Sequence, residues 1–425
     1  SIVRNQHAVV GEHGKKDKAA EFEHGKKKDF HYLCYHKETC LVDTDSEPPQ
    51  GINQEALQIA LQIAKIFKCK IPDEIHVMRK IVVDGSNTSG FQRTALVGYN
   101  GYLQTSRGKV GIASVAVEED AARRIKDDKN SVTFRLDRLG IPLIEIATDP
   151  DIKDPEHAKE TAEKLGMILR STAKVKRGLG TIRQDVNVSI KNGNRVEIKG
   201  FQDLRSMIKI IENEVKRQSK GNVKKEVRKA ESDFSTSFLR PMPGAARMYP
   251  ETDVKPILIT KELLKSIELP ELLDEKVLKL EKQGVNPDLA RILVKDGIFL
   301  DEFEYSLDKN LIASVLVEMP KDIKKRFNLD YYFSKDDFIL VLENLDNGNL
   351  NKESAFEVLT DIAQEKKIDM SKYKQIDFKD LEKDIKAIVE KNKKLSVGAL
   401  MGIVMNKYRG KVEGRVVSEL IRKYL

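Results

Sequence analysis

Three consecutive carboxylates, Glu118, Glu119 and Asp120, end an apolar run, and two arginines follow at positions 123 and 124. Consecutive acids repel one another, so solvent, the arginines or a cation must offset their charge. Mg²⁺ takes hard oxygen ligands, usually one or two carboxylates together with waters and phosphate oxygens. A solvated helix start gives a similar pattern, because acids there favour the helix dipole. The run alone therefore leaves a metal site and a solvated helix start both open.

A second set of charged residues lies between positions 183 and 199. The alternation of polar and apolar residues around Asn192-Gly193 predicts a β-hairpin. Its polar positions are Asp185, Asn187, Ser189, Arg195, Glu197 and Lys199, with Arg183 just before them. Acids and bases on one face of a sheet can hold a metal and a phosphate together, and they can equally form a ladder of cross-strand ion pairs.

The loop length of this hairpin decides which side chains share a face. A two-residue loop would pair residue 189 with 196 and would set a polar face beside an apolar one. A three-residue loop at 192–194 pairs 189 with 197 and 187 with 199, and both faces are then consistent. We therefore predict the three-residue loop, with the acids at 185 and 197 on the same face.

A third candidate is the loop Asp84-Gly-Ser-Asn-Thr-Ser-Gly-Phe-Gln-Arg-Thr94, which gathers hydroxyls, amides and glycines around one phenylalanine and one arginine. Such a loop suits binding of a polar small group or a ribose-phosphate. A long turn without a ligand explains it equally well.

The remaining sequence indicates the elements that must position these residues. Asn53 can cap a helix whose apolar residues recur at helical spacing up to Phe67, and Asp154-Pro155 can start another. Residues 75–150 consist of short alternating runs broken by glycine, which predicts antiparallel strands. Residues 1–50 are predicted to be extended and irregular, 203–217 a helix, and 219–232 a charged connector. Beyond about residue 260 the pattern is helical, with a break near Leu345-Asp-Asn-Gly348.

Composition sets the outer limits of the interpretation. The chain has 425 residues, of which 40% are hydrophobic, and a net charge of +8. This length predicts about three domains, and the basic balance fits a polyanionic partner. Three cysteines do not make a disulfide framework and favour a reducing compartment, and the spacing of Cys34 and Cys40 lacks the close pair of structural zinc sites. No run of 18 apolar residues predicts a membrane span, so we expect a cytoplasmic protein without membrane contact.

Several stretches together, in this order, resemble the E subunit of the archaeal glutamyl-tRNA(Gln) amidotransferase, which is related to the bacterial B subunit. They are Asp84–Thr94, Val117–Arg124, Phe134-Arg-Leu-Asp-Arg-Leu-Gly-Ile-Pro-Leu-Ile-Glu145, Thr148-Asp-Pro-Asp151, Arg183-Gln-Asp-Val-Asn-Val-Ser189, Val196-Glu-Ile-Lys199, Arg240-Pro-Met-Pro243, Met248-Tyr-Pro-Glu-Thr-Asp253 and Gly398-Ala-Leu-Met-Gly402. The resemblance covers the chain from about residue 30 to its end. The loop at 84–94 points to the E subunit over the B subunit.

The resemblance implies an activity and partners. Such a subunit uses ATP and Mg²⁺ to phosphorylate the γ-carboxylate of glutamate misacylated on tRNA(Gln), and ammonia then displaces the phosphate. An asparaginase-like glutaminase, the D subunit (GatD), supplies the ammonia, and the two subunits form a heterotetramer. The implied fold is α+β: an antiparallel-strand-rich cradle domain (1–260), then all-α helical (261–345) and YqeY-like tail (346–425) domains.

The resemblance also implies roles for residues of this sequence. Glu118, Glu119 and Asp185 match the metal-binding positions of the family, which favours a metal site over a solvated helix start. Glu119→Gln is therefore expected to abolish phosphorylation. These three residues and Arg183 are the predicted catalytic residues. The predicted substrate- and ATP-binding residues are Ser86, Asn87, Arg93, Asn187, Glu197 and Lys199.

Two segments that the family normally carries are not found. One is an opening strand of the Gly-Leu-Glu-Ile-His type, and the other is a large synthetase-like domain, in whose place only residues 219–232 stand. A tRNA-binding scaffold without chemistry is therefore the alternative function, although retention of the carboxylates argues against it. A third hypothesis is an enzyme that attaches an amino acid to tRNA, but no sequence motif of adenylate-forming enzymes supports it.

The tail carries a separate prediction. Residues 391–425 contain nine lysines or arginines against two glutamates. Gly398 and Gly402 are one helical turn apart, which allows close backbone approach to a partner. Lys407, Arg409 and Lys411 follow them directly. We predict that these three residues hold the phosphate backbone of tRNA, with a solvated helical cap as the alternative.

Overall fold

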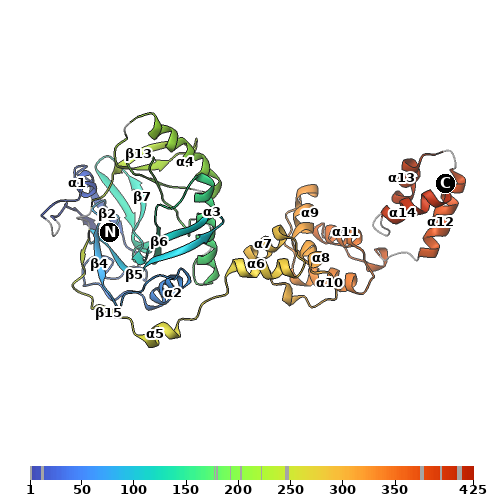
Figure 1. The fold of residues 1–425 in the computed structure, drawn as a ribbon, viewed down its shortest axis with the longest axis horizontal. Helices are drawn as coiled ribbons and strands as arrows, with labels where there is room; N and C mark the ends of the chain where they lie inside the picture. The colour runs from blue at the N-terminus through green and yellow to red at the C-terminus, as the bar shows by residue number, and fades with distance from the viewer. Residues whose placement is uncertain are drawn as a thin grey trace. The chain divides into compact units, whose positions relative to one another are not determined.

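The computed structural model describes residues 2–10, 14–176, 178, 180–191, 193–201, 203–221, 223–244, 248–373, 378–392, 395–408 and 414–425. The chain divides into two compact units, Ser1–Leu272 and Leu273–Leu425. The strands of the described residues all lie in the first unit, and the second is helical (Figure 1). The predicted α+β class is confirmed. Over the residues described, no helix combines the length and the apolar character needed to cross a bilayer.

A five-stranded antiparallel sheet forms the centre of the first unit. Its order is β14 (Met248–Pro250), β4 (Val77–Ile81), β5 (Phe91–Thr105), β6 (Gly108–Glu119) and β9 (Pro142–Thr148). Helix α2 (Gln54–Ile66) covers one face, where Leu57 and Leu61 pack with Val77, Ala95 and Val117. The predicted cap is confirmed, because the side chain of Asn53 accepts from the amide of Ala56. The other face of this sheet is free to carry polar side chains.

A four-stranded sheet, ordered β10 (Val186–Val188), β11 (Val196–Lys199), β12 (Glu226–Ala230) and β13 (Thr236–Pro241), forms the second layer. Its apolar face packs on α3 (Pro155–Ser171) and α4 (Leu204–Ser219). Asp154 and Asp203 cap these helices. The prediction that 219–232 is only a connector is wrong, since β12 pairs in parallel with β11 and buries Val227 completely.

The predicted hairpin forms, but with a different register. Asn187 lies opposite Glu197 and Val188 opposite Val196, so neither the two-residue nor the three-residue loop is correct. The intervening residues are held elsewhere: the amide of Ile190 donates to Gln218 of α4, and the side chain of Asn194 donates to the carbonyl of Val223. The shift is two residues, so the predicted common face is kept.

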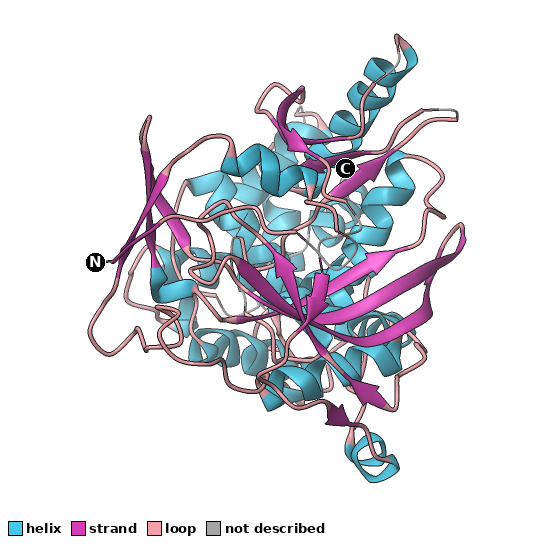
Figure 2. Ribbon diagram, turned by 90° about the vertical axis from the view of Figure 1, so that its left-hand side faces the viewer, coloured by secondary structure: helices cyan, strands magenta, loops and turns pink. Residues whose placement is uncertain are grey.

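Two smaller sheets complete the first unit. One has the order β1 (Ile2–Arg4), β2 (Asp29–Leu33), β8 (Ser131–Arg135) and β7 (Arg123–Asp127), and the other pairs β15 (Ile257–Leu258) with β3 (Glu74–Ile75). Helix α1 (Lys18–His24) precedes β2, and α5 (Lys261–Ser266) follows β15. Residues 1–50 are therefore more regular than predicted. In Figure 2 the strands of these sheets are drawn in magenta and the helices in cyan.

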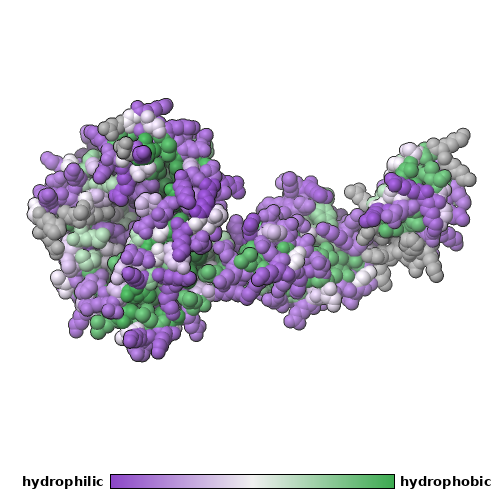
Figure 3. All heavy atoms as spheres, viewed as in Figure 1, coloured by the Kyte–Doolittle hydropathy of each residue, from purple (hydrophilic) through white to green (hydrophobic). Residues whose placement is uncertain are grey.

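The second unit contains α6 (Leu273–Lys282), α7 (Pro287–Asp296), α8 (Lys309–Ala313), α9 (Met319–Phe327), α10 (Lys335–Asp346), α11 (Lys352–Ala363), α12 (Phe378–Lys391), α13 (Val397–Tyr408) and α14 (Gly414–Tyr424). One hydrophobic cluster runs from Val277 to Tyr373, and α12 to α14 form another. The ranges 1–260, 261–345 and 346–425 remain a prediction, and the first cluster extends across position 345. The face seen in Figure 3 is largely hydrophilic.

Candidate active site

The face of the five-stranded sheet opposite α2 carries two carboxylates side by side. Glu118 of β6 lies opposite Thr94 of β5, and Glu145 of β9 lies opposite Ala116. Alternation along β6 directs residues 116 and 118 to the same face, so the two glutamates meet and share a hydrogen bond. Lys80 of β4 completes the group and forms an ion pair with Glu118. Glu118 is 8% exposed, which makes this pair of like charges costly without compensation.

The two carboxyl groups titrate differently. Reduced solvation and the charge of Glu118 raise the pKa of Glu145 to about 7. Burial opposes ionisation of Glu118, but Lys80, Glu145 and Thr94 outweigh it and lower the pKa of Glu118. Glu145 therefore exchanges a proton near neutral pH while Glu118 stays ionised. Such a pair is ready to exchange the proton for a cation.

Glu119 lies on the opposite face of the same sheet. Arg93 donates from Nε to its Oε2 at 3.0 Å, and a second guanidinium nitrogen contacts Oε1. Arg93 also donates to the carbonyl of Gln50. The predicted metal residues Glu118 and Glu119 are thus not brought together, because adjacent residues of a strand point to opposite faces. Arg93, predicted to bind substrate, has its donors in use.

The charged face of the four-stranded sheet supplies the other half of the site. Lys199 donates to Asp185 at 2.6 Å and lies 2.7 Å from Glu197, so these three predicted residues do come together. Asn187 is exposed opposite Glu197. The charge of Lys199 also acts on Glu145, lowering its pKa against the larger effects that raise it. The two sheets therefore face each other with charged residues, and their apolar faces turn toward the helices.

A hydrogen bond joins segments that border the two sheets. Arg183, which precedes β10, donates from Nη2 to Asp120 at 3.2 Å. Asp120 follows Glu119 and is 8% exposed. Asp120 extends the strand pairing, since its amide donates to Ile141 and its carbonyl accepts from Gly140. It therefore shares the face of Glu118.

The loop at 84–94 is largely occupied with its own structure. The hydroxyl of Ser86 donates to Asp84, and the amide of Asn87 donates to Ser86. Gln6, Tyr32 and Asp43 hold the loop backbone or its side chains from outside. Gly85 lies against the ring of Phe30 with φ +81°, where a Cβ atom would come within 2.2 Å of the ring. Ser86 and Asn87, predicted to bind substrate, thus form their hydrogen bonds within the loop.

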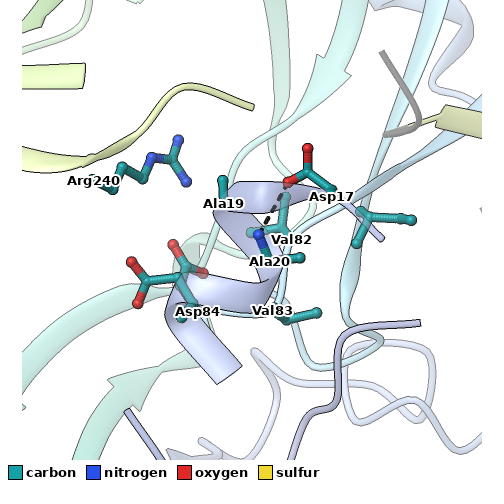
Figure 4. A pocket seen from close by; sticks show the side chains of 9 residues that line it. Asp17, Ala19, Ala20, Val82, Val83, Asp84 and Arg240 are labelled. Atoms are coloured by element: carbon teal, nitrogen blue, oxygen red, sulfur yellow. Dashed lines mark hydrogen bonds between the residues drawn. The ribbon is translucent and has the colours of Figure 1, made fainter. Parts of the chain in front are cut away.

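Two hollows border this loop. One, of about 10 Å³, is lined by residues that include Asp17, Val83, Asp84 and Arg240 (Figure 4), and it has room for a single water. The other, of about 310 Å³, is lined by the segment from Arg4 to His7, by Thr88 to Phe91 and by Tyr249 among others. Of these two, the second is of a size for a small organic ligand.

The tail residues are only partly observed. Lys407 of α13 donates to Asp384 of α12 at 2.6 Å and lies over the ring of Tyr408. Arg409 and Lys411 lie outside the described residues. Among the residues described, no three or more His, Cys, Asp or Glu side chains form a group that could hold a metal. Cys34 and Cys40 are among the residues described, so they belong to no such group.

Besides Lys80 of the carboxylate group, sequence analysis missed Glu145. It ends the stretch 134–145 that carries part of the family resemblance, but it was not singled out as a site residue. The available signal was a single acid within an apolar strand, Pro-Leu-Ile-Glu-Ile-Ala-Thr at 142–148. An acid at such a position is a candidate for a functional role, and its partner lies 27 positions away on another strand.

Comparison with known proteins defines the class to which this fold and site belong. Residues 21–265 match the profile described as the GatB/GatE catalytic domain, and residues 302–425 match one described as a GatB domain. The chain belongs to the GatB/GatE family, with its catalytic domain followed by a helical YqeY-like domain.

Individual relatives agree with this class, and each of them is named as the E subunit of a glutamyl-tRNA(Gln) amidotransferase. The chain is 35% identical to the relative from Archaeoglobus fulgidus, over 97% of this chain and 90% of the relative. It is also 35% identical to the one from Methanocaldococcus jannaschii, over 100% and 93% of the two chains. The relative from Methanosarcina barkeri is 34% identical over 98% and 91%.

Proposed function

We propose that this chain is the subunit of a tRNA-dependent amidotransferase that converts glutamate on tRNA(Gln) to glutamine with ATP and Mg²⁺. The observation that carries the proposal is the carboxylate pair Glu118 and Glu145, flanked by Lys80 and Lys199 between two sheets. The names of the relatives support the tRNA substrate. An asparaginase-like glutaminase (GatD) would supply the ammonia, in a cytoplasmic heterotetramer.

The donor set fits Mg²⁺. Two carboxylates that hydrogen-bond to each other, one of them holding a proton with a pKa of about 7, offer hard oxygen ligands once that proton leaves. Bound there, Mg²⁺ would neutralise charge on the phosphates of ATP. Asp185, the third predicted metal residue, is ion-paired with Lys199, so its role is to hold that lysine in the site.

The reaction needs positioning and charge neutralisation more than covalent help from protein. An oxygen of the γ-carboxylate forms a bond to the γ-phosphorus of ATP as the bond to the bridging oxygen breaks and ADP leaves. Ammonia then bonds to the activated carbonyl carbon, phosphate leaves with the C–O electron pair, and nitrogen loses a proton to solvent. Lys80 keeps Glu118 ionised, and Lys199 places a positive charge opposite Glu145.

Binding of tRNA would use the second unit. Its tail is basic, with a net charge of +7 from nine cations and two anions over residues 391–425. Lys407 is exposed although paired with Asp384, and it can exchange that partner for a phosphate. Lys407, Arg409 and Lys411 remain the proposed contacts.

The test is the phosphorylation step itself. In the complex with its glutaminase partner, Glu118→Gln and Glu145→Gln should each lower ATP-dependent phosphorylation of glutamyl-tRNA by about a hundredfold or more, because a metal ligand is lost. Binding of the charged tRNA should change less than about twofold. Glu160→Gln is the matched control, since Glu160 is a surface acid bonded to Ser106 away from the site.

Two outcomes would overturn the proposal. A wild-type complex that binds charged tRNA but never phosphorylates it would favour the non-catalytic scaffold. Full turnover by both glutamine variants would show that the carboxylate pair is not the metal site.

A further inference from the structure

Asp120 is contacted by two arginines that come from distant parts of the chain. Arg183 donates to its Oδ1 at 3.2 Å, and Nε of Arg138 lies 3.4 Å from its Oδ2. Arg138 belongs to the 3₁₀ turn Leu136–Arg138, and Arg183 lies at the start of the hairpin. One buried carboxylate thus collects two guanidinium groups at the point where the two sheets meet.

Hydrogen bonds hold the two arginines in place, but some of their N–H donors have no protein acceptor. Arg138 also donates from Nε to the carbonyl of Ala121 at 3.0 Å and from Nη2 to that of Ala122 at 3.3 Å. Within the described part of the chain, Nη1 of Arg138 and both Nη1 and Nε of Arg183 donate to no protein group. The side chains are 40% and 53% exposed, so these donors reach solvent.

The charges of this group do not balance. Two guanidinium ions against one carboxylate leave a net charge of +1, although a single arginine would have neutralised Asp120. Guanidinium groups bind phosphate oxygens by charge-assisted hydrogen bonds, and Nη1 of each arginine is available to donate one to a ligand. A group built only to stabilise the fold would not need the second, half-exposed arginine.

The location identifies which anion would be bound. Asp120 follows Glu118 by two positions on the same face, so their Cα atoms are about 7 Å apart. Arg183 likewise precedes Asp185, the partner of Lys199, by two positions. An anion held by the arginines therefore lies next to the carboxylate pair, at a distance that a chain of phosphates can span.

We propose that Arg138 and Arg183, oriented by Asp120, form a clamp for the phosphoryl oxygens of the nucleoside triphosphate. This inference rests on the proposed function and adds to it a binding site for the polyphosphate. Asp120 is a positioning residue, because it acts through the two arginines.

Steady-state kinetics of the complex with its glutaminase partner test the clamp. Arg183→Ala should raise the KM for ATP about tenfold or more, since each arginine–phosphate bond is charge-assisted. The KM for charged tRNA should change less than about twofold. Arg138→Lys keeps the charge but loses the Nη1 donor, and it should raise the KM for ATP by a smaller factor. Its ammonium group can donate to the carbonyl of Ala121 or Ala122, which the side chain of alanine could not do.

Arg107→Ala is the matched control. Arg107 is also ion-paired with an aspartate, Asp154, and its side chain is 42% exposed, but it lies at the turn between β5 and β6 away from the site. Its variant should keep both KM values.

The outcomes separate the clamp from the proposed function. If the wild-type complex phosphorylates glutamyl-tRNA but Arg183→Ala and Arg138→Lys keep the KM for ATP, the clamp is wrong and the function stands. If only the KM for tRNA rises, the anion is an RNA phosphodiester and the clamp is again wrong. If the wild-type complex shows no ATP-dependent phosphorylation, the proposed function itself fails.

Discussion

The two faces of the five-stranded sheet carry the same kinds of residue in opposite arrangements. On the face toward α2, two acids each have an arginine: Arg93 binds Glu119, and Arg79 binds Glu251, whose side chain is fully buried. On the other face, Glu118 and Glu145 lie against each other, and Lys80 of β4 forms an ion pair with Glu118. On the first face, arginines of the protein neutralise both acids. On the second face, two acids lie together beside one ion-paired lysine, so a bound cation would be stabilised there.

This difference separates structural from functional carboxylates that sequence alone cannot distinguish. Glu118 and Glu119 are neighbours with the same side chain, yet one belongs to each face. Complementary pairs stabilise a fold, whereas like charges held together cost stability and persist where they serve binding or chemistry. Changes to the two faces therefore test the comparison.

The largest effect on stability is expected from the pair of Arg79 and Glu251. Arg79 donates to Glu251 from Nε at 2.8 Å and lies near the rings of Phe91 and Tyr249. Arg79→Ala leaves a buried carboxylate without its partner and should lower the free energy of unfolding by about 3 kcal/mol. Chemical denaturation measures this. A loss below about 0.5 kcal/mol, the range of an exposed pair, would contradict a structural role.

The adjacent acids at 118 and 119 allow a sharper contrast. Glu119→Gln removes the negative charge that accepts two hydrogen bonds from Arg93, and it should lower the free energy of unfolding by about 1–2 kcal/mol. We expect phosphorylation of glutamyl-tRNA to fall by less than about tenfold, because Glu119 faces away from the site. The expectation that this variant abolishes phosphorylation came from the family resemblance. If Glu119→Gln and Glu118→Gln lose activity equally, the two faces do not differ in the way proposed.

The smallest effect concerns the pH dependence of stability. The folded-state pKa of Glu145, about 7, lies above its ordinary value of 4.5, so the folded chain binds more protons than the unfolded chain between these values. This contribution to stability is complete below pH 4.5 and is lost as the pH rises through about 7. The side chain of Glu145 is only partly desolvated and keeps contact with water, which screens the effect, so we expect only about 1 kcal/mol.

Thermal unfolding of the metal-free chain from about pH 5 to about pH 8 measures this contribution. Glu145→Gln should make the curve flatter, and added Mg²⁺ should restore stability at the alkaline end in the wild-type chain only. A variant curve parallel to that of the wild type would mean that Glu145 is not the titrating group.

Local patterns in the sequence predicted local structure well. The caps at Asn53 and Asp154 and the strands between 75 and 150 were all readable from spacing. The hairpin at 185–199 was predicted with the correct faces and the wrong register, because its loop is held by Gln218 and Val223 rather than by turn chemistry. Alternation fixes a face, but contacts from other elements choose among registers two residues apart.

The site depended on contacts that spacing does not encode. Glu145 was missed because its partner Glu118 is 27 positions away, and the pairing of β6 with β9 brings them together. The role of residues 219–232 was missed for the same reason, since β12 adds to β11 in parallel, which no local turn predicts. Ser86 and Asn87 have side chains of a kind that can bind a ligand, yet those side chains serve the loop itself.

The pairing of β14 with β4 and of β15 with β3 has a consequence for how the chain is made. Residues 74–81 pair with residues 248–258, so the ribosome must add roughly 170 further residues before the edge of the sheet can close. Until then Arg79 lacks Glu251, and the strand edge is open to other chains. A recombinant fragment of the first unit should therefore extend through Leu258, and one that stops at β13 would leave that edge exposed during synthesis.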